Sequence, residues 1–277
     1  MHFHQWKRRS FITLLGSAAV WPFALRAQQT EERSRALLGR ILRLHADATV
    51  DKIDLFVDGL ADHIGWTVLR PPSMSIEARR FDCLRLLRQA PAVLEIAQFD
   101  EAGKEQLRVS RLAMDAAPRN ADLSGEAKFT EAVAKGTYRG PVYFREMDRQ
   151  DPPTVLPCMT LSVAGRRRDA GVSMAEVGLK PIQDMVSRVK VGDHGVVGVL
   201  EAGDLVIAHS DGSLIQRDFS SVAHVKAARA AGAAIMVAQV SRDRNRSDVF
   251  AIAVPVAKLG WLVVVELPLA EAATVAQ

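Results

Sequence analysis

Apolar residues recur at helical spacing along the first part of the chain, with charged residues between them. No proline or glycine interrupts residues 41–58, so the pattern predicts one long amphipathic helix over residues 31–60. A second helix is predicted over residues 75–87, with Ser73 or Ser75 as its N-cap and Pro91 beyond its end. The apolar positions of the long helix are Leu37, Leu38, Ile41, Leu42, Leu44, Val50, Ile53, Leu55, Phe56 and Leu60.

Beyond Pro91 the hydrophobic period changes from helical spacing to two, which is typical of half-buried strands. A turn at residues 100–104, which contains Gly103, predicts a hairpin between the first two strands. Pro181 suits the first turn of a helix, where its missing N–H is not needed. The predicted elements are strands at 93–99 and 106–112, a helix at 127–135, strands at 140–145, 158–165 and 171–179, and a helix at 181–189.

The same order of elements then begins again in a shorter form. Its elements are strands at 195–200 and 205–209, a helix at 220–231, and strands at 234–241, 249–256 and 261–267. We therefore predict an α+β fold in which the two N-terminal helices (28–90) precede two PAS-like modules. Each module is an antiparallel sheet with flanking helices. The first module covers residues 91–190 and the second module residues 191–268, and residues 269–277 form a polar tail.

The N-terminus has the order of an export signal, which we assign to residues 1–27. Lys7, Arg8 and Arg9 precede an apolar run at 11–25, and Ala27 ends it. The Arg8–Arg9 pair resembles the twin-arginine motif and predicts a periplasmic protein. The run contains only about 16 residues between Arg9 and Arg26, fewer than the roughly 20 that span a bilayer. Cleaved export and an uncleaved N-terminal membrane anchor both remain open.

Composition excludes a mainly disordered protein, a collagen-like fibre and a disulfide-dense miniprotein. With 48% hydrophobic and 25% charged residues among 277, the chain is an ordinary globular protein with room for a sizeable core. The formal net charge of +4 resides in the predicted signal, because the remaining 32 of 36 basic residues balance 32 acidic ones. A neutral body makes nucleic acid an improbable partner. Cys83 and Cys158 form either one disulfide or two separately buried thiols.

Four stretches resemble the double Cache family of extracytoplasmic ligand-sensing modules found in bacterial sensor histidine kinases, cyclases and chemoreceptors. The most specific is the closing Leu259-Gly260-Trp261 followed by an apolar strand, paired with residues 205–211. The other three are residues 140–145, 159–165 and 170–179. The resemblance covers about residues 31–270. It implies a ligand sensor that dimerises through the long N-terminal helix. Such sensors usually continue into a transmitter, which we do not find in this sequence, so we expect either a free-standing binder that signals through a membrane partner or a receptor that lost its transmitter.

The resemblance also implies that the first module is membrane-distal and binds the ligand on the sheet face away from the long helix. Strand alternation then selects the side chains on that face. They combine hydroxyl and charged groups with an apolar side chain, as a small polar ligand requires. The candidate ligand-binding residues are Tyr143, Arg145, Thr160, Ser162, Met174 and Glu176.

One departure from the family bears on the ligand. Amino-acid-sensing Cache domains carry Arg-x-Trp-Tyr at the short helix and Tyr-x-Asp on the next strand, where the acid grips the ammonium group. Here the helix reads Lys128-Phe129-Thr130-Glu131 and the strand reads Tyr143-Phe144-Arg145. A guanidinium suits a carboxylate or phosphate, which favours a small organic anion. The alternative is an internal ion pair between Arg145 and Glu176, and both readings stay open.

No motif supports catalysis, a cofactor or a metal site. His209 and Asp211 favour a turn-stabilising role, and the chain has neither a His-x-x-x-His nor a Cys-x-x-Cys spacing. Serines lack the Gly-x-Ser-x-Gly context of hydrolases. We therefore predict a non-enzymatic, exported ligand-binding sensor. The alternative is a solute-binding protein of a transport system, although the antiparallel strand pattern differs from the two βαβ lobes typical of that class.

Overall fold

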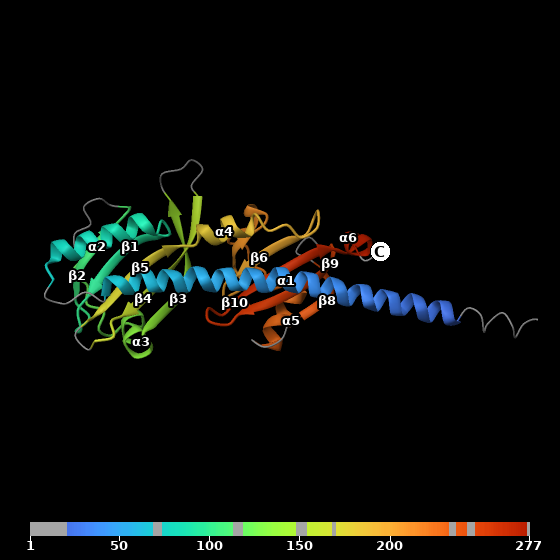
Figure 1. Ribbon diagram of the computed structural model, residues 1–277, viewed down its shortest axis with the longest axis horizontal. Coiled ribbons are helices and arrows are strands. Elements are labelled where there is room, and N and C mark those ends of the chain that lie inside the picture. Colours follow the sequence, from blue (N-terminus) through green and yellow to red (C-terminus); the bar gives the residue numbers. More distant parts are fainter. Residues whose placement is uncertain are drawn as a thin grey trace, which may run out of the picture.

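The computed structural model describes residues 21–68, 74–112, 119–147, 154–167, 170–232, 237–242 and 247–275. Figure 1 shows a long helix that runs beside two sheets lying one after the other. In chain order the elements are α1 (Trp21–Val68), α2 (Ile76–Gln89), β1 (Val93–Phe99), β2 (Glu105–Ser110), α3 (Ala127–Lys135), β3 (Thr137–Met147), β4 (Thr154–Ala164), β5 (Val172–Gly178), α4 (Lys180–Val186), β6 (Val196–Leu200), β7 (Val206–His209), the short 3-10 helix η1 (Gly212–Leu214), α5 (Ala223–Ala231), β8 (Val237–Arg242), β9 (Asp248–Val256), β10 (Trp261–Pro268) and α6 (Leu269–Val275).

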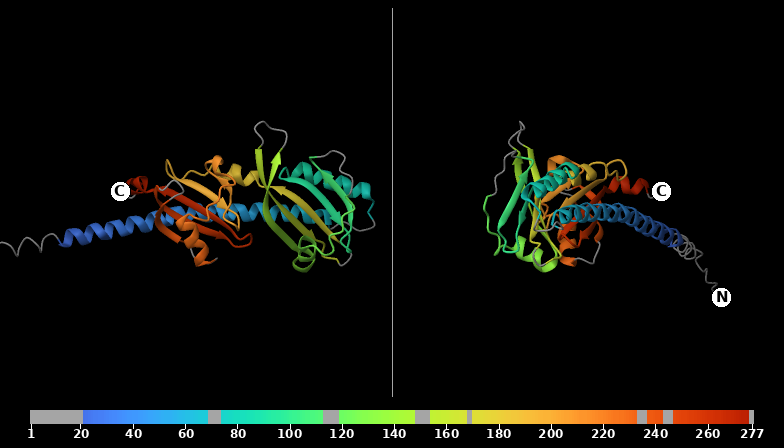
Figure 2. Two further views of the ribbon diagram at one scale, coloured as in Figure 1. Left: turned by 180° about the vertical axis from the view of Figure 1, so that it is seen from behind. Right: turned by 60° about the vertical axis from the view of Figure 1, so that its left-hand side comes forward.

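Helix α1 packs against both sheets. Gly39 lies against Phe250 of β9, whereas Gly65 lies against Val163 of β4, so the helix passes from the second module to the first. Figure 2 shows the same path from two further directions. The buried side chains of α1 recur every three or four residues, which keeps one helix face on the sheets throughout. They include Leu38, Leu42, Ala46, Ile53, Val57, Leu60, Ile64 and Val68.

Helix α1 is longer than the sequence predicts at both ends. It continues past Gly59 because Leu60, Ala61 and Ile64 pack into the core, which outweighs the low helix propensity of glycine. It also includes residues 21–27 of the predicted export signal, while residues 1–20 lie outside the described residues. The signal and its cleavage therefore stay predictions. None of the helices in the described part of the chain combines the length and apolar character that a bilayer crossing requires.

Helix α2 begins where the sequence places it. The Ser75 hydroxyl accepts a hydrogen bond from the backbone N–H of Ala78 at 3.2 Å, which caps the first turn. Cys83, Leu86 and Leu87 are buried against the first sheet in the same cluster as α1. Both N-terminal helices thus cover one face of that sheet.

The two sheets have the same topology. The strand order is β2-β1-β5-β4-β3 in the first and β7-β6-β10-β9-β8 in the second, and every pair of neighbours is antiparallel. Replacing each strand of the first sheet by the one five places later produces the second. This confirms the predicted α+β architecture of two PAS-like modules behind a long helix.

The corresponding hairpin turns also share their chemistry. In the first module the Asp100 carboxylate accepts hydrogen bonds from the backbone N–H groups of Ala102 and Lys104. In the second module the Glu201 carboxylate accepts from Gly203 and Leu205 in the same way. An acid at the start of each turn therefore replaces backbone partners that the turn residues lose.

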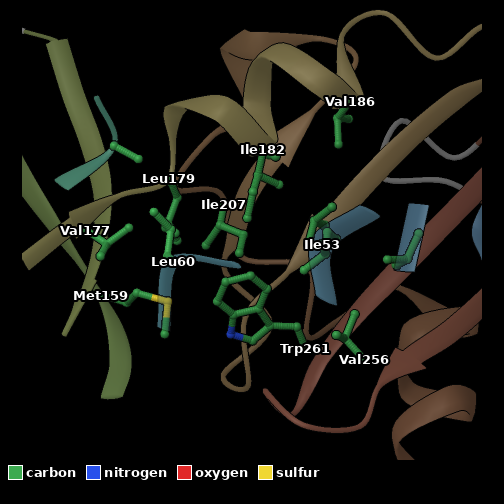
Figure 3. Close-up of a cluster of buried hydrophobic side chains, with 14 of the residues drawn as sticks. Ile53, Leu60, Met159, Val177, Leu179, Ile182, Val186, Ile207, Val256 and Trp261 are labelled. Atoms are coloured by element: carbon green, nitrogen blue, oxygen red, sulfur yellow. The ribbon is translucent and has the colours of Figure 1, made fainter. Parts of the chain in front are cut away.

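One apolar core joins the modules. Figure 3 shows side chains from α1, α4 and both sheets meeting in a single cluster. Met159 and Val177 come from the first sheet, and Ile207 and Trp261 from the second, all at 2% exposure or less. Removing a large side chain from such a core costs about 2–5 kcal/mol, so the two modules stabilise each other through it.

The segment predicted as a polar tail, residues 269–277, includes a helix that the sequence analysis did not predict. Residues Leu269–Val275 form helix α6. Ala272 is buried in the common core, and the Glu271 carboxylate accepts hydrogen bonds from the backbone N–H groups of Asp193 and His194. The sequence pattern did not predict this helix, because the groups that Glu271 contacts lie about 80 residues away in the chain.

Asp58 of α1 bridges the two modules. Arg139 of β3 donates to Oδ1 at 2.9 Å, and Lys258 of the β9–β10 turn donates to Oδ2 at 2.6 Å. The hydrogen bond from Lys258 is the largest cause that lowers the pKa of Asp58. One carboxylate thus holds a cation from each module at the junction.

We predict that Asp58→Asn lowers the free energy of unfolding, because it removes the negative charge that pairs with Arg139 and Lys258. The loss should be only about 1 kcal/mol at neutral pH, since the carboxylate is partly exposed to solvent. The folded-state pKa lies below the ordinary value of 3.8, so the stabilisation is present above that pH and is lost as pH falls below it. Urea unfolding of variant and wild type should therefore converge at acid pH. Asp51→Asn, an exposed aspartate of the same helix, is the matched control.

Candidate functional site

A cavity of about 220 Å³ lies on the face of the first sheet that points away from α1. Strands β1, β2, β3, β4 and β5 form its floor, and α3 with the segment 119–123 forms its wall. This volume is below the roughly 300–1,000 Å³ of pockets for drug-sized ligands, so the cavity has room only for a small molecule. Its lining residues are Glu95, Ala97, Phe99, Arg108, Arg119, Ala121, Leu123, Lys128, Tyr143, Thr160, Met174, Ala175 and Glu176.

Four of the six residues proposed from the sequence line this cavity: Tyr143, Thr160, Met174 and Glu176. Strand register brings them together, because Thr160 lies opposite Glu176 across β4 and β5. Met159 and Leu161, which alternate with Thr160, face the α1 core instead. The expected sheet face is therefore the one that carries the cavity.

The other two predicted residues lie beside the cavity and do not line it. Arg145 Nη1 donates to Glu176 Oε1 at 2.5 Å, so the ion pair that the sequence left open is present. Direct binding of an anion by Arg145 stays a prediction. Ser162 is fully buried between Tyr138 and Met174, and its hydroxyl has no hydrogen-bond partner among the described residues.

A buried ionic network lies at the β1–β2 side of the floor. Arg108 forms ion pairs with Glu95 and with Glu105, the latter at 2.6 Å. The Glu105 side chain is completely buried and also accepts hydrogen bonds from the backbone N–H groups of Arg119 and Ala121. This network fixes the 119–121 segment over the cavity, because a buried carboxylate must keep its donors.

Two cations at the wall are held less tightly. Arg119 approaches Glu95 only at 3.9 Å and is 69% exposed, while Lys128 of α3 lies 3.3 Å from Glu126 and is 33% exposed. Both line the cavity. Their long side chains can therefore turn towards a bound anion at small cost, since exposed pairs of this kind are weak.

Tyr143 supplies a hydroxyl on the opposite side of the floor. Burial, followed by the negative charge of Glu176, raises the pKa of Tyr143, so the phenol stays protonated and can donate a hydrogen bond. Burial likewise raises the pKa of the neighbouring Cys158 thiol to about 12. Cys83 and Cys158 are both free and buried, which corresponds to the separate-thiol alternative.

Sequence reasoning missed Glu95, Arg108, Arg119 and Lys128. The first lies on the same face of β1 as Ala97 and Phe99, so alternation was available as a signal once β1 was known to neighbour β5. Arg108 could be found in the same way on β2. Arg119 and Lys128 lie outside strands, and no periodicity in the sequence places a loop residue over a sheet.

His209 and Asp211 have the structural role that the sequence favoured. His209 Nδ1 accepts a hydrogen bond from the backbone N–H of Asp211 at 2.9 Å, and Asp211 in turn caps η1 through Ser213. Across the described residues no group of three or more His, Cys, Asp and Glu side chains is arranged to hold a metal ion.

Solved structures with the same arrangement are ligand-binding domains of bacterial chemoreceptors. The domain of Campylobacter jejuni Tlp3 in complex with L-norvaline superposes with a TM-score of 0.61 at 14% identity, covering 88% of this chain and 94% of that one. The Pseudomonas aeruginosa PctB domain with L-Arg has a TM-score of 0.59 at 14% identity, with 86% and 90% covered. The PctC domain of the same organism with GABA has 0.54 at 16% identity, with 80% and 95% covered.

The chain has the double Cache fold. No protein-family model matches the sequence, and no curated protein matches it significantly. Identities this low establish the arrangement of the elements and leave the ligand to be argued from the cavity itself.

We predict that the buried network of the double Cache floor responds unequally to the loss of its two arginines. Arg108→Met should lower the free energy of unfolding by about 3 kcal/mol, because it leaves the carboxylates of Glu95 and Glu105 without their arginine partner beside an apolar sheet. Arg119→Met, which removes an exposed side chain of the same kind, should change it by less than about 0.5 kcal/mol. Denaturant titration at neutral pH measures both, and similar losses for the two variants would contradict the prediction.

Proposed function

We propose that this chain is an exported ligand-binding sensor protein that binds a small organic anion in the cavity of the first module. The observation that supports it is the charge of the cavity wall. Arg119 and Lys128 line the cavity from outside the sheet, and among the described residues neither has a carboxylate closer than 3.3 Å. A carboxylate ligand would supply the charge-assisted hydrogen bonds that these two groups lack.

The floor supports an anion over a cationic amine. Both carboxylates of the lining, Glu95 and Glu176, already have an arginine partner, namely Arg108 and Arg145. The lining itself holds three cationic residues and two anionic ones. Tyr143 and Thr160 add hydroxyl groups for the polar part of the ligand, while Phe99, Leu123 and Met174 offer apolar contact.

The neighbouring structures are consistent with a carboxylate. L-norvaline, L-Arg and GABA all contain that group, although each also carries an amine. Arg145 stands where amino-acid-sensing Cache domains have the aspartate that binds the ammonium group. Its guanidinium also pairs with Glu176, so that carboxylate is not available to an amine. We therefore place this chain with sensors of organic anions.

Signalling is proposed to proceed through α1 to a membrane partner, with the chain acting as a homodimer outside the cytoplasm. Helix α1 contacts β4 and β5 of the first sheet as well as β9 and β10 of the second, so a shift in the ligand-binding sheet displaces the helix against both modules. Transport-linked solute binding is less favoured, because both sheets are antiparallel and neither has the crossover helices of a βαβ lobe.

We predict that the purified chain is stabilised against heat by short carboxylates and not by the corresponding amines. Lys128→Gln should weaken carboxylate binding about tenfold through the loss of one charge-assisted hydrogen bond. The matched control is Lys135→Gln, which removes an exposed lysine at the C-terminal end of the same helix, two turns from Lys128 and outside the cavity lining, where it pairs with Glu131. Isothermal titration calorimetry with the best carboxylate measures each variant.

Two outcomes would refute the anion proposal. One is selectivity for amines that lack a carboxylate. The other is equal affinity of Lys128→Gln and Lys135→Gln for the carboxylate, since only Lys128 lines the cavity.

A further inference from the structure

A groove between α1 and α2 takes no part in the site described above. Figure 1 and Figure 2 show α2 beside the end of α1 that lies on the first sheet. The groove, called here the α1–α2 groove, contains a cavity of about 230 Å³ on the sheet face opposite to the one that carries the first cavity. Its lining residues share one face of each helix, and they are His63, Trp66 and Thr67 of α1 and Asp82, Arg85, Leu86 and Gln89 of α2.

A buried amide holds the two walls of the groove at a fixed spacing. Gln98 of β1 is 3% exposed, and its side chain contacts both helices. Its Nε2 donates to the carbonyl of Thr67 at 3.1 Å, while its Oε1 accepts from Arg79 Nε at 2.8 Å. The Thr67 hydroxyl is also hydrogen-bonded to that of Ser173 of β5 at 2.9 Å. The groove is therefore formed before a ligand arrives, which lowers the cost of ordering it on binding.

Helix α2 brings mainly positive charge to the groove, since it contains four arginines and two acids. The exposed Arg85 lines the groove, and none of the described residues forms an ion pair or a hydrogen bond with its side chain. The same holds for the side chains of His63 and Gln89. Asp82, the one acid of the lining, already interacts within the chain. An anion in the groove would supply the acceptor that Arg85 lacks.

The groove also offers an aromatic surface. Trp66 lines it from α1 and is 68% exposed, while Leu86 lines it from α2 and is buried. A single exposed aromatic side chain needs no explanation by itself. Here, however, the indole and the guanidinium of Arg85 line the same cavity, so a ligand that combines a ring with an anionic group would contact both.

We propose that the α1–α2 groove is a second binding site of this chain and that it takes a small planar aromatic carboxylate. The ring lies against Trp66 and Leu86, and the carboxylate accepts hydrogen bonds from Arg85, whose planar fork suits two oxygens at once. His63 and Gln89 supply further polar groups. The inference goes beyond the proposed function, because this site lies on the other face of the sheet and does not depend on the anion cavity.

Fluorine NMR of the full chain labelled with 5-fluorotryptophan tests occupancy, with benzoate as the probe. The resonance of Trp66, assigned by its loss in Trp66→Phe, should shift and saturate as benzoate is added, while that of the buried Trp261 stays in place. Benzyl alcohol, which lacks the charge, should bind at least about tenfold more weakly, and cyclohexanecarboxylate, which lacks the planar ring, about threefold more weakly. No shift up to about 10 mM benzoate, or equal affinity for either analogue, would overturn the proposal.

A pair of arginine variants tests the anion contact by the same Trp66 signal. Arg85→Gln should raise the dissociation constant of benzoate about tenfold, because it removes the charge that faces the carboxylate. Arg88→Gln is the matched control, since Arg88 is an exposed arginine of the same helix that does not line the groove, and it should change the constant by less than about twofold. Both side chains are exposed, so neither substitution should disturb folding. Equal effects of the two variants would overturn the assigned contact.

The two sites are told apart by Lys128→Gln, which alters the lining of the first cavity only. The response of Trp66 to benzoate should be the same in this variant as in the wild type, and its disappearance would overturn a separate site. A chain that short carboxylates fail to stabilise, but whose Trp66 resonance still responds, would refute the first site and leave the groove standing. A Trp66→Ala variant that changes the sedimentation of the chain, without any benzoate shift in the wild type, would show that a protein covers the groove and would overturn the proposal.

Discussion

The contact between one face of α1 and both sheets is the constraint on which the rest of this structure depends. Neither sheet could bury its apolar face alone, because each has only a few short flanking helices of its own. Leu42, Ile53 and Ile64, spread along α1, enter the same core as Trp261 and Met159 of the two sheets. The modules therefore share one hydrophobic cluster, and the Asp58 bridge adds a polar contact at the junction where that cluster crosses between them.

Because α1 occupies one face of each sheet, the opposite faces are free to differ. In the second module this face is filled by apolar side chains from α5 and the η1 region, among them Phe219 and Val225, which pack against Val264. In the first module the corresponding face holds the cavity and its charged lining. Two sheets of identical topology thus have different chemistry, and the difference comes from the side chains that face away from α1.

The charges of the first module are arranged so that each carboxylate of the floor has an arginine. Arg108 pairs with Glu95, and Arg145 pairs with Glu176. The buried Glu105 also pairs with Arg108 and accepts hydrogen bonds from backbone N–H groups of the 119–121 segment above the cavity. Such pairing is required because an unpaired carboxylate on a largely apolar sheet is costly. The two cations of the lining that are held least tightly are Arg119 and Lys128 at the wall, and these are the groups proposed to meet a ligand. The site is therefore built mostly from groups that keep its own charges in place.

Local patterns determined the order and type of the elements. The apolar spacing of α1, the Ser75 cap and the apolar run of β10 act within a few residues, so the sequence alone predicts them, together with the repeated plan of two antiparallel modules. Alternation also placed Tyr143, Thr160, Met174 and Glu176 on the face that carries the cavity. The export signal lies mostly outside the described residues and stays a prediction from sequence.

Tertiary structure decided what depends on contacts between distant residues. The extension of α1 past Gly59, the helix at residues 269–275, the closure of Arg145 onto Glu176, and the placement of Arg119 and Lys128 over the sheet all need partners far away in the chain. A periodic pattern records which face of an element is buried, since burial acts on each residue separately. It does not record which charged side chains meet, because an ion pair is a property of two positions whose separation only the folded chain defines.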